Sequence, residues 1–337
     1  MNTYRLCLLV LLFTAPLITS LYEAPLYQRE TFLVNAGYAN NVKVYVVYDN
    51  NPYLSGLAVS WGLSLYIVVD DLVLLFDTGG NGDILLENMR KLGLDPSSID
   101  VVVLSHIHGD HVGGLFKLLE VNPNITVYLP ESFPVDFKNR IVSMGARIVE
   151  VKEPTVISKG VMTTGEIYGN GVYEQALIII THSGTLVFTG CAHPGVDKIV
   201  SRAAELTGTK ILLVGGGFHL AGSSEDRIKS IINTFKEYGV EYVMPIHCSG
   251  DLARQLFKEA YGDKCILAGV GYSFTLQDLI ETPIEYTTTT TKSIYTASNT
   301  TKPGLGTTAL VSAFLVWAIL FTVVLIVIII VYKKTHR

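Results

Sequence analysis

Short apolar runs and amphipathic stretches alternate through the middle of this 337-residue chain. Runs rich in β-branched residues predict strands at Val42–Tyr48, Ser64–Val69, Leu72–Phe76, Val101–Leu104, Ile125–Leu129, Leu177–Thr181, Thr185–Thr189, Ile211–Val214, Tyr242–Pro245 and Ile266–Val270. Apolar residues at helical spacing predict helices at Asp83–Leu92, Val112–Leu119, Val196–Leu206, Glu225–Tyr238 and Leu252–Tyr261. Because hairpins come first and strands then alternate with helices, we expect a layered α/β fold in which helices cover the sheets.

The two ends of the chain have a different pattern. The N-terminal end has one basic residue before a short apolar run, which is typical of a secretory signal. The C-terminal end has an uncharged apolar stretch, long enough to cross a hydrocarbon layer of about 30 Å, with basic residues after it. We therefore expect a cell-surface, extracytoplasmic protein with a single-pass anchor. The predicted parts are a signal peptide at 1–20, a domain at 21–283, a Thr-rich stalk at 284–308, a transmembrane helix at 309–332 and a cytoplasmic tip at 333–337.

Composition and charge limit the function classes. With 49% apolar residues the chain is not intrinsically disordered. The formal net charge is −5, and the middle is more acidic than the whole because both ends are net basic. An acidic domain is a poor partner for a polyanion, so we expect no nucleic-acid partner and a small-molecule substrate instead.

Histidines gather directly after the predicted strand Val101–Leu104. His106, His108, Asp110 and His111 lie within six residues, and a spacing of two places the first two imidazoles on the same side of an extended backbone. Three imidazoles and a carboxylate suit zinc, with manganese or iron as alternatives. The sequence therefore predicts a site for one or two divalent metal ions.

Other polar residues follow predicted strands farther along the chain. His193, His219 and His247 each lie just beyond a strand, and loops at one end of a sheet can converge. Given the first cluster, we expect His193 and His247 to join it, although each alone is more typical of a structural histidine. Asp77 ends another strand and either orients a ligand histidine or caps a turn. Gly215–Gly217 either offer backbone N–H groups to a substrate anion or form a tight turn.

These motifs together resemble the metallo-β-lactamase superfamily. The resemblance rests on His-x-His-x-Asp-His after a strand and on five further stretches, which are Trp61–Ser64, Phe76–Gly79, Gly190–Gly195, Gly216–His219 and His247–Cys248. Within the superfamily, the chain is similar to the branch that includes archaeal 7,8-dihydropterin-6-yl-methyl-4-(β-D-ribofuranosyl)aminobenzene 5'-phosphate synthases. The resemblance implies an αββα sandwich with metals at one edge.

The resemblance also implies roles for individual residues. His106, His108 and His193 would hold one metal, Asp110, His111 and His247 would hold a second, and Asp77 would support the cluster. Many members carry a bridging aspartate after the strand that corresponds to Thr185–Thr189, where this chain has Gly190-Cys191-Ala192-His193. Either Cys191 or His219 then completes the second site, or the protein holds a single metal.

The expected activity is that of a metal-dependent hydrolase that uses a metal-bound hydroxide, with Asp110 orienting it or accepting its proton. His219 is a further candidate for substrate binding. Three alternatives stay open: a transferase like the branch's synthase, a nuclease, and a non-catalytic metal-binding surface module. The sequence leaves the scissile bond and the oligomeric state undetermined.

Overall fold

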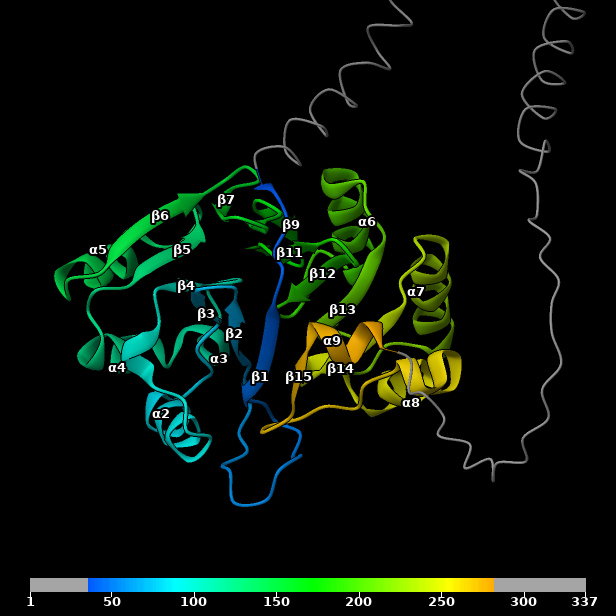
Figure 1. The fold of residues 1–337 in the computed structure, drawn as a ribbon, viewed down its shortest axis with the longest axis horizontal. Helices are drawn as coiled ribbons and strands as arrows, with labels where there is room; N and C mark the ends of the chain where they lie inside the picture. The colour runs from blue at the N-terminus through cyan, green and yellow to red at the C-terminus, as the bar shows by residue number, and fades with distance from the viewer. Residues whose placement is uncertain (1–35, 282–337) are drawn as a thin grey trace, which may run out of the picture. The chain divides into compact units, whose positions relative to one another are not determined.

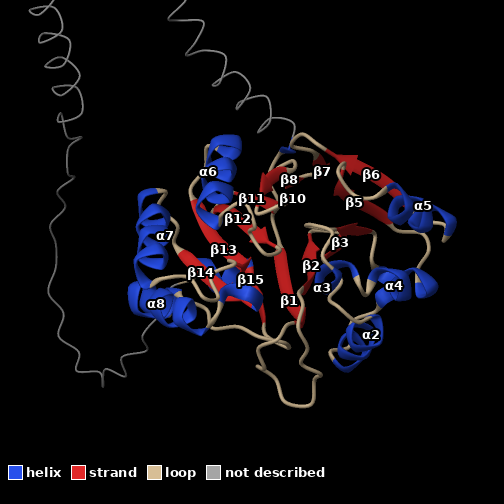
Figure 2. Ribbon diagram, turned by 180° about the vertical axis from the view of Figure 1, so that it is seen from behind, coloured by secondary structure: helices blue, strands red, loops and turns tan. Residues whose placement is uncertain are grey.

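The computed structural model describes residues 36–281, which form two stacked β-sheets with helices on their outer faces (Figures 1 and 2). One sheet has the order β15-β1-β2-β3-β4-β5-β6 and the other β14-β13-β12-β11-β8-β7, while β9 and β10 form a separate hairpin. The strands are β1 Val42–Tyr48, β2 Ser64–Val69, β3 Leu72–Phe76, β4 Val101–Val103, β5 Thr126–Pro130, β6 Arg147–Val151, β7 Val156–Ser158, β8 Val161–Thr163, β9 Ile167–Gly169, β10 Val172–Glu174, β11 Leu177–Thr181, β12 Gly184–Thr189, β13 Ile211–Gly217, β14 Tyr242–Ile246 and β15 Ser273–Thr275. The α-helices are α2 Gly82–Lys91, α3 Gly109–Val112, α4 Leu115–Val121, α5 Val135–Ser143, α6 Val196–Thr207, α7 Glu225–Glu237, α8 Asp251–Tyr261 and α9 Leu276–Ile280, and the 3₁₀ turns are Pro96–Ser98, His247–Ser249 and Gly262–Lys264.

The central strands are apolar on both faces because each sheet is covered on both sides. In β12, Leu186 and Phe188 pack between the sheets, whereas Val187 points outward to the helices. In β3, Leu74 packs inward and Leu75 packs outward. Successive side chains of a strand point to opposite faces, so one continuous apolar run serves two cores.

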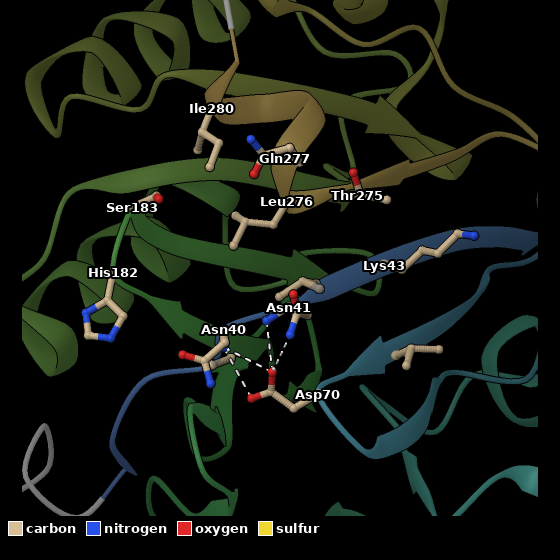
Figure 3. Close-up of a pocket in the computed structure, with 13 residues that line it drawn as sticks. Asn40, Asn41, Lys43, Asp70, His182, Ser183, Thr275, Leu276, Gln277 and Ile280 are labelled. Atoms are coloured by element: carbon tan, nitrogen blue, oxygen red, sulfur yellow. Dashed lines mark hydrogen bonds between the residues drawn. The ribbon is translucent and has the colours of Figure 1, made fainter.

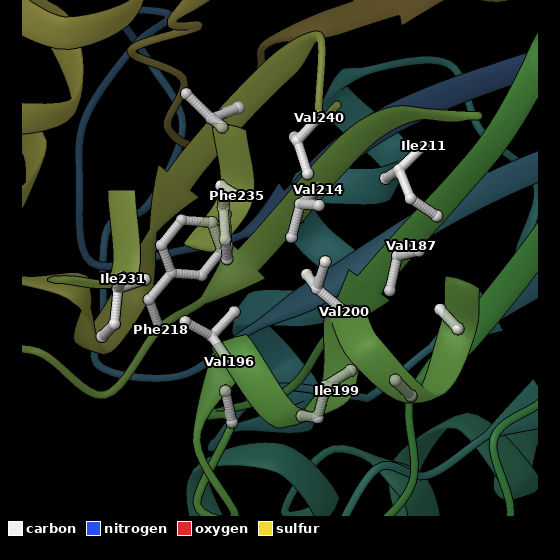
Figure 4. Packing of buried hydrophobic residues seen from close by; sticks show 14 of the residues in the cluster. Val187, Val196, Ile199, Val200, Ile211, Val214, Phe218, Ile231, Phe235 and Val240 are labelled. Atoms are coloured by element: carbon white, nitrogen blue, oxygen red, sulfur yellow. The ribbon is translucent and has the colours of Figure 1, made fainter. Parts of the chain in front are cut away.

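The outer cores bury the apolar faces of the helices. Figure 4 shows Val187 and Val214 of the second sheet facing Ile199 of α6 and Phe235 of α7. On the first sheet, α2 and α4 contribute Leu85 and Leu118 to the corresponding layer. The αββα sandwich predicted from the sequence is therefore confirmed.

Two predicted elements differ from the structure. The predicted helix Val112–Leu119 is divided into α3 and α4, because Gly113 and Gly114 lie against the backbone oxygens of Gly80 and Thr78. The predicted strand Ile266–Val270 is wrong. Val270 exchanges backbone hydrogen bonds with the loop at Asn51 and Leu54, and the sheet edge is instead formed by β15.

The predicted signal peptide, stalk, transmembrane helix and cytoplasmic tip lie outside the described residues. Within residues 36–281, none of the helices has both the length and the apolar character needed to cross a membrane.

Candidate metal centre

Five strand ends meet at one edge of the sandwich and carry the predicted ligands. Strands β3 and β4 run parallel in one sheet, and β12, β13 and β14 run parallel in the other. The residues that follow these strands are Asp77, Ser105 to His111, Cys191 to His193, His219, and His247 with Cys248. Because the carboxyl ends of parallel strands lie at the same edge, residues far apart in sequence converge there.

Asp77 organises two of the histidines from a fully buried position. Its Oδ2 lies 2.7 Å from His111 Nδ1 and accepts the Ser105 hydroxyl at 2.7 Å, while Oδ1 accepts the Ser105 backbone N–H at 2.7 Å. Ser105 Oγ lies 2.9 Å from His106 Nδ1. Since the hydroxyl hydrogen is donated to Asp77, Ser105 accepts from His106 Nδ1–H. Asp77 therefore fixes the orientation of His111 directly and that of His106 through Ser105.

The rings of His111 and His247 face each other through their Nε2 atoms. Their Nε2 atoms are 3.2 Å apart. His247 Nδ1 lies 2.8 Å from Asn50 Oδ1, so both Nδ1 atoms carry hydrogen and, in the neutral rings, both Nε2 atoms present lone pairs. Two acceptors at this separation fit a shared cation. The donor set thus suits a divalent metal.

His193 gives a second indication of a metal. Both of its ring nitrogens are buried and have no hydrogen-bond partner among the described residues. Its ring lies 4.8 Å from that of His106 and 4.7 Å from that of His108. His106 Nε2 in turn lies 3.1 Å from His108 Nδ1. Buried polar atoms without partners are costly, and a coordinated ion would satisfy one of the two nitrogens.

Ligand atoms within 4.8 Å of one another form three groups: Asp110, His111, Cys191 and His247; His106, Cys191 and His193; and Cys191, His219 and Cys248. Cys191 is common to all three. Its sulfur is therefore within reach of the ligand atoms of all three groups. His108 borders the second group through His106 and His193.

Burial and charge affect the histidines differently. Burial, together with neighbouring imidazoles, lowers the pKa of His106 well below its usual value and that of His193 to about 4. Burial also lowers the pKa of His111, but the negative charges of Asp77 and Asp110 outweigh it and raise this pKa to about 9. His106 and His193 therefore keep a lone pair at neutral pH, whereas His111 releases a proton when a metal binds.

Several supporting residues had not been predicted. Buried Glu174 accepts the backbone N–H groups of Cys191, Ala192 and His193 at 2.8 to 2.9 Å and so holds the loop that carries two candidate ligands. Burial raises the pKa of Glu174 to about 7, although these hydrogen bonds lower it. Ser105 and Cys248 adjoin predicted ligands in sequence, which was an available signal. Glu174 and Asn50 have no local signal, because only the tertiary fold brings them to the site.

Backbone strain marks the same edge. Asp77, Ala192, His219 and His247 have φ values of 57°, 60°, 53° and 50°, in the left-handed region that non-glycine residues rarely adopt. Such conformations persist where surrounding contacts hold them, and they gather at functional sites.

Gly215–Gly217 form neither of the two alternatives, an anion-binding loop or a tight turn, because all three lie in β13. Gly215 and Gly216 lie inside β13 with strands on both sides, and the N–H of Gly217 donates to Gly190 O. A Cβ on Gly216 would overlap Thr189 O. These glycines instead allow close packing beneath the site.

Gly190→Ala should disturb the support of His106. The new Cβ would overlap Ser105 Oγ and lie 3.0 Å from Asp77 Oδ2. We expect a loss of about 1–3 kcal/mol in unfolding free energy from overpacking, and a roughly 10–100-fold loss of metal affinity from the displaced Ser105. Chemical denaturation and metal titration measure both. Gly109→Ala is the matched control because nothing lies within 4 Å of its Cβ, and equal losses in both variants would contradict the interpretation.

A cavity of about 400 Å³ lies at the opposite edge of the first sheet (Figure 3). Its lining includes Lys43, Asp70 and His182, and Asp70 accepts the backbone N–H groups of Asn40 and Asn41. The cavity contains none of the candidate ligands. His182 stacks on Tyr38, with the ring centroids 4.5 Å apart.

Comparison with known proteins agrees with this geometry. The profile of the family described as the Metallo-beta-lactamase superfamily matches residues 61–237. The chain belongs to this superfamily. The crystal structure of Tm1679, described as a metal-dependent hydrolase of the beta-lactamase superfamily, has 32% sequence identity and a TM-score of 0.59, and the match covers 69% of this chain and 98% of that one.

Two other known proteins are similar to this chain over most of their length. The 7,8-dihydropterin-6-methyl-4-(beta-D-ribofuranosyl)-aminobenzene-5'-phosphate synthase of Methanocaldococcus jannaschii is 31% identical over 282 residues, which span 68% of this chain and 95% of that enzyme. YhfI from Bacillus subtilis has 16% identity and a TM-score of 0.55, with 70% of this chain and 99% of YhfI covered, and shows the shared fold. The resemblance to the archaeal synthase branch is thereby confirmed.

The prediction of an extracytoplasmic, single-pass membrane protein at the cell surface is wrong, and we correct it. The M. jannaschii relative, which is aligned with this chain over 95% of its own length, is a synthase. The transmembrane and extracellular assignments are withdrawn.

Proposed function

We propose that this superfamily member is a metal-dependent hydrolase of a small molecule. The observation that carries the proposal is the unequal burial of the ligand cluster. His106 and His111 are fully buried, whereas Asp110 is partly exposed and both His108 and His219 are exposed. Structural metal sites are closed, while catalytic sites keep a position open to water and substrate. The side of this cluster that carries His108 and Asp110 is open to water in this way.

The candidate ligands remain those predicted from the sequence: His106, His108 and His193 for one ion, and Asp110, His111 and His247 for a second, with Cys191 between them. A bound divalent ion supplies a water of lowered pKa, near 7 for zinc, and polarises the electrophile. The donor set suits zinc, manganese or iron.

Asp110 is the residue to which we assign the orienting role. Its Oδ2 lies 3.3 Å from His247 Nε2 and 3.6 Å from His111 Nε2, and its carboxylate faces the open side. Burial raises the pKa of Asp110, but the nearby imidazoles of His247 and His111 lower it below its usual value overall. The carboxylate is therefore ionised at neutral pH and accepts hydrogen bonds. Trp61, exposed and 4.9 Å from the His247 ring, borders this entrance and offers an apolar face to substrate.

Asp110→Asn tests the role of this carboxylate. We expect turnover to fall on the order of 100-fold, because the amide orients a proton-bearing nucleophile poorly, while the ion held by His106 and His193 stays bound. The assay uses full-length chain reconstituted with zinc, manganese or iron and a panel of phosphoester, lactone, thioester and β-lactam substrates. Tight metal binding without turnover of any class would favour the non-catalytic module.

The similarity to the M. jannaschii synthase favours a second candidate, a transferase that forms the product for which that relative is named. Both candidates use the same cluster. Product analysis separates them: a hydrolase uses water to split one substrate into two fragments, whereas a transferase joins part of one substrate to a second substrate and releases the leaving group of the first.

A further inference from the structure

Two buried thiols meet beside the histidine cluster. Cys248 Sγ lies 3.3 Å from Cys191 Sγ and 3.7 Å from Cys191 O. The side chains are 5% and 4% exposed, respectively. Cys191 follows β12 and Cys248 follows His247 at the end of β14, so the approach is made by the parallel strand ends of the second sheet. Gly217 leaves the necessary room, because a Cβ there would lie 2.8 Å from Cys248 Sγ.

His219 completes this group from the intervening strand β13. One ligand atom of each of the three residues lies within 4.8 Å of the others. The His219 backbone is held in the left-handed region at φ 53°, and its side chain is exposed. Two sulfurs and one imidazole therefore face a common point that is open on the His219 side.

We propose that Cys191, His219 and Cys248 form a further metal position for a thiophilic divalent ion such as zinc. Thiolates and imidazole are preferred ligands of zinc, and the second sulfur, that of Cys248, distinguishes this group from the two groups beside it, which contain only Cys191. The position goes beyond the proposed hydrolysis, which uses only the other two groups. Cys191 links this position to the histidine groups, because its sulfur lies 3.2 Å from His111 Nε2.

The test uses Co²⁺ as a spectroscopic probe of sulfur ligation. Full-length chain is reduced, stripped by a chelator and titrated with Co²⁺ without oxygen, and the bound ions and the sulfur-to-cobalt charge-transfer absorption are measured. We expect Cys248→Ser to lose one bound ion and about half of this absorption, since sulfur rather than oxygen produces the band. Cys265→Ser is the matched control, because Cys265 is also buried and free but lies outside all three groups.

His219→Ala provides a second variant that keeps both thiols and changes an exposed side chain. We expect the same ion to bind roughly tenfold or more weakly, with an unchanged melting temperature of the metal-free chain. An ion count and absorption in Cys248→Ser equal to those of the wild type would overturn the proposal, as would a Cys191–Cys248 disulfide that persists under reduction.

The test of the thiol metal position is independent of the proposed hydrolysis, because the two proposals predict different results for His106→Ala and Cys248→Ser. If His106→Ala keeps all activity while Cys248→Ser loses its ion, the hydrolase proposal fails and the thiol site stands. If His106→Ala loses activity and Cys248→Ser changes neither ion count nor absorption, the reverse holds.

Discussion

Replacing His106 by alanine should remove metal from the histidine groups and abolish turnover while the sandwich stays folded. His106 is fully buried, and its Nε2 faces His108 while its ring lies against His111 and His193. Loss of a ligand should lower metal affinity by more than about 100-fold, since even partners of ligands contribute 10–100-fold. Elemental analysis of the purified chain and activity after reconstitution measure the two effects.

His182→Ala is the control for this variant. His182 is also a histidine beside a strand end, but it stacks on Tyr38 at the opposite edge of the sheet. We expect its metal content and turnover to equal those of the wild type. A His106→Ala protein that is metal-free and fully active would refute the role of the cluster in catalysis.

Asp77→Ala should produce the largest loss of stability. The carboxylate is fully buried and accepts hydrogen bonds from Ser105 and His111. The substitution leaves these donors unpaired and removes the negative charge beside His111, whose pKa is raised to about 9. Removing one partner from a buried charged pair costs about 3–5 kcal/mol in unfolding free energy. Chemical denaturation of the metal-free chain measures this loss.

Metal affinity should fall in the same variant by roughly 10–100-fold, because His106 and His111 lose their fixed orientation. Asp70→Ala is the matched control: Asp70 also has a left-handed backbone, at φ 50°, and also accepts backbone N–H groups, but it lies away from the site. We expect it to lose about 0.5–1.5 kcal/mol of stability and to bind metal normally. Equal metal affinity in both variants would show that Asp77 has only a structural role.

The sequence predicted those parts of the site in which the functional residues are neighbours along the chain. The cluster from His106 to His111 was visible because its ligands are adjacent, and a strand before it fixes their spacing. The central strands were visible for a similar reason, since burial on both faces makes them continuously apolar. The edge strand Arg147–Val151 was missed because its charged residues interrupt that pattern.

Sequence patterns did not predict contacts between residues that are far apart along the chain. Nothing near Glu174 indicates that it holds the loop of Cys191 and His193, and the separation of 57 residues between Cys191 and Cys248 conceals their contact. The glycines of β13 illustrate the same limit, because they serve either a turn or close packing and only their neighbouring strands decide which.

The sequence by itself determined the strand and helix types, the histidine cluster after β4 and the family resemblance, because these depend on spacing within one segment. Tertiary structure alone decided that Asp77 orients two histidines, that Cys191 is common to three ligand groups and that Cys248 lies beside it. The physical reason is that the burial of apolar surface stacks the two sheets and aligns their parallel strand ends, and this driving force is not specific to any ligand residue.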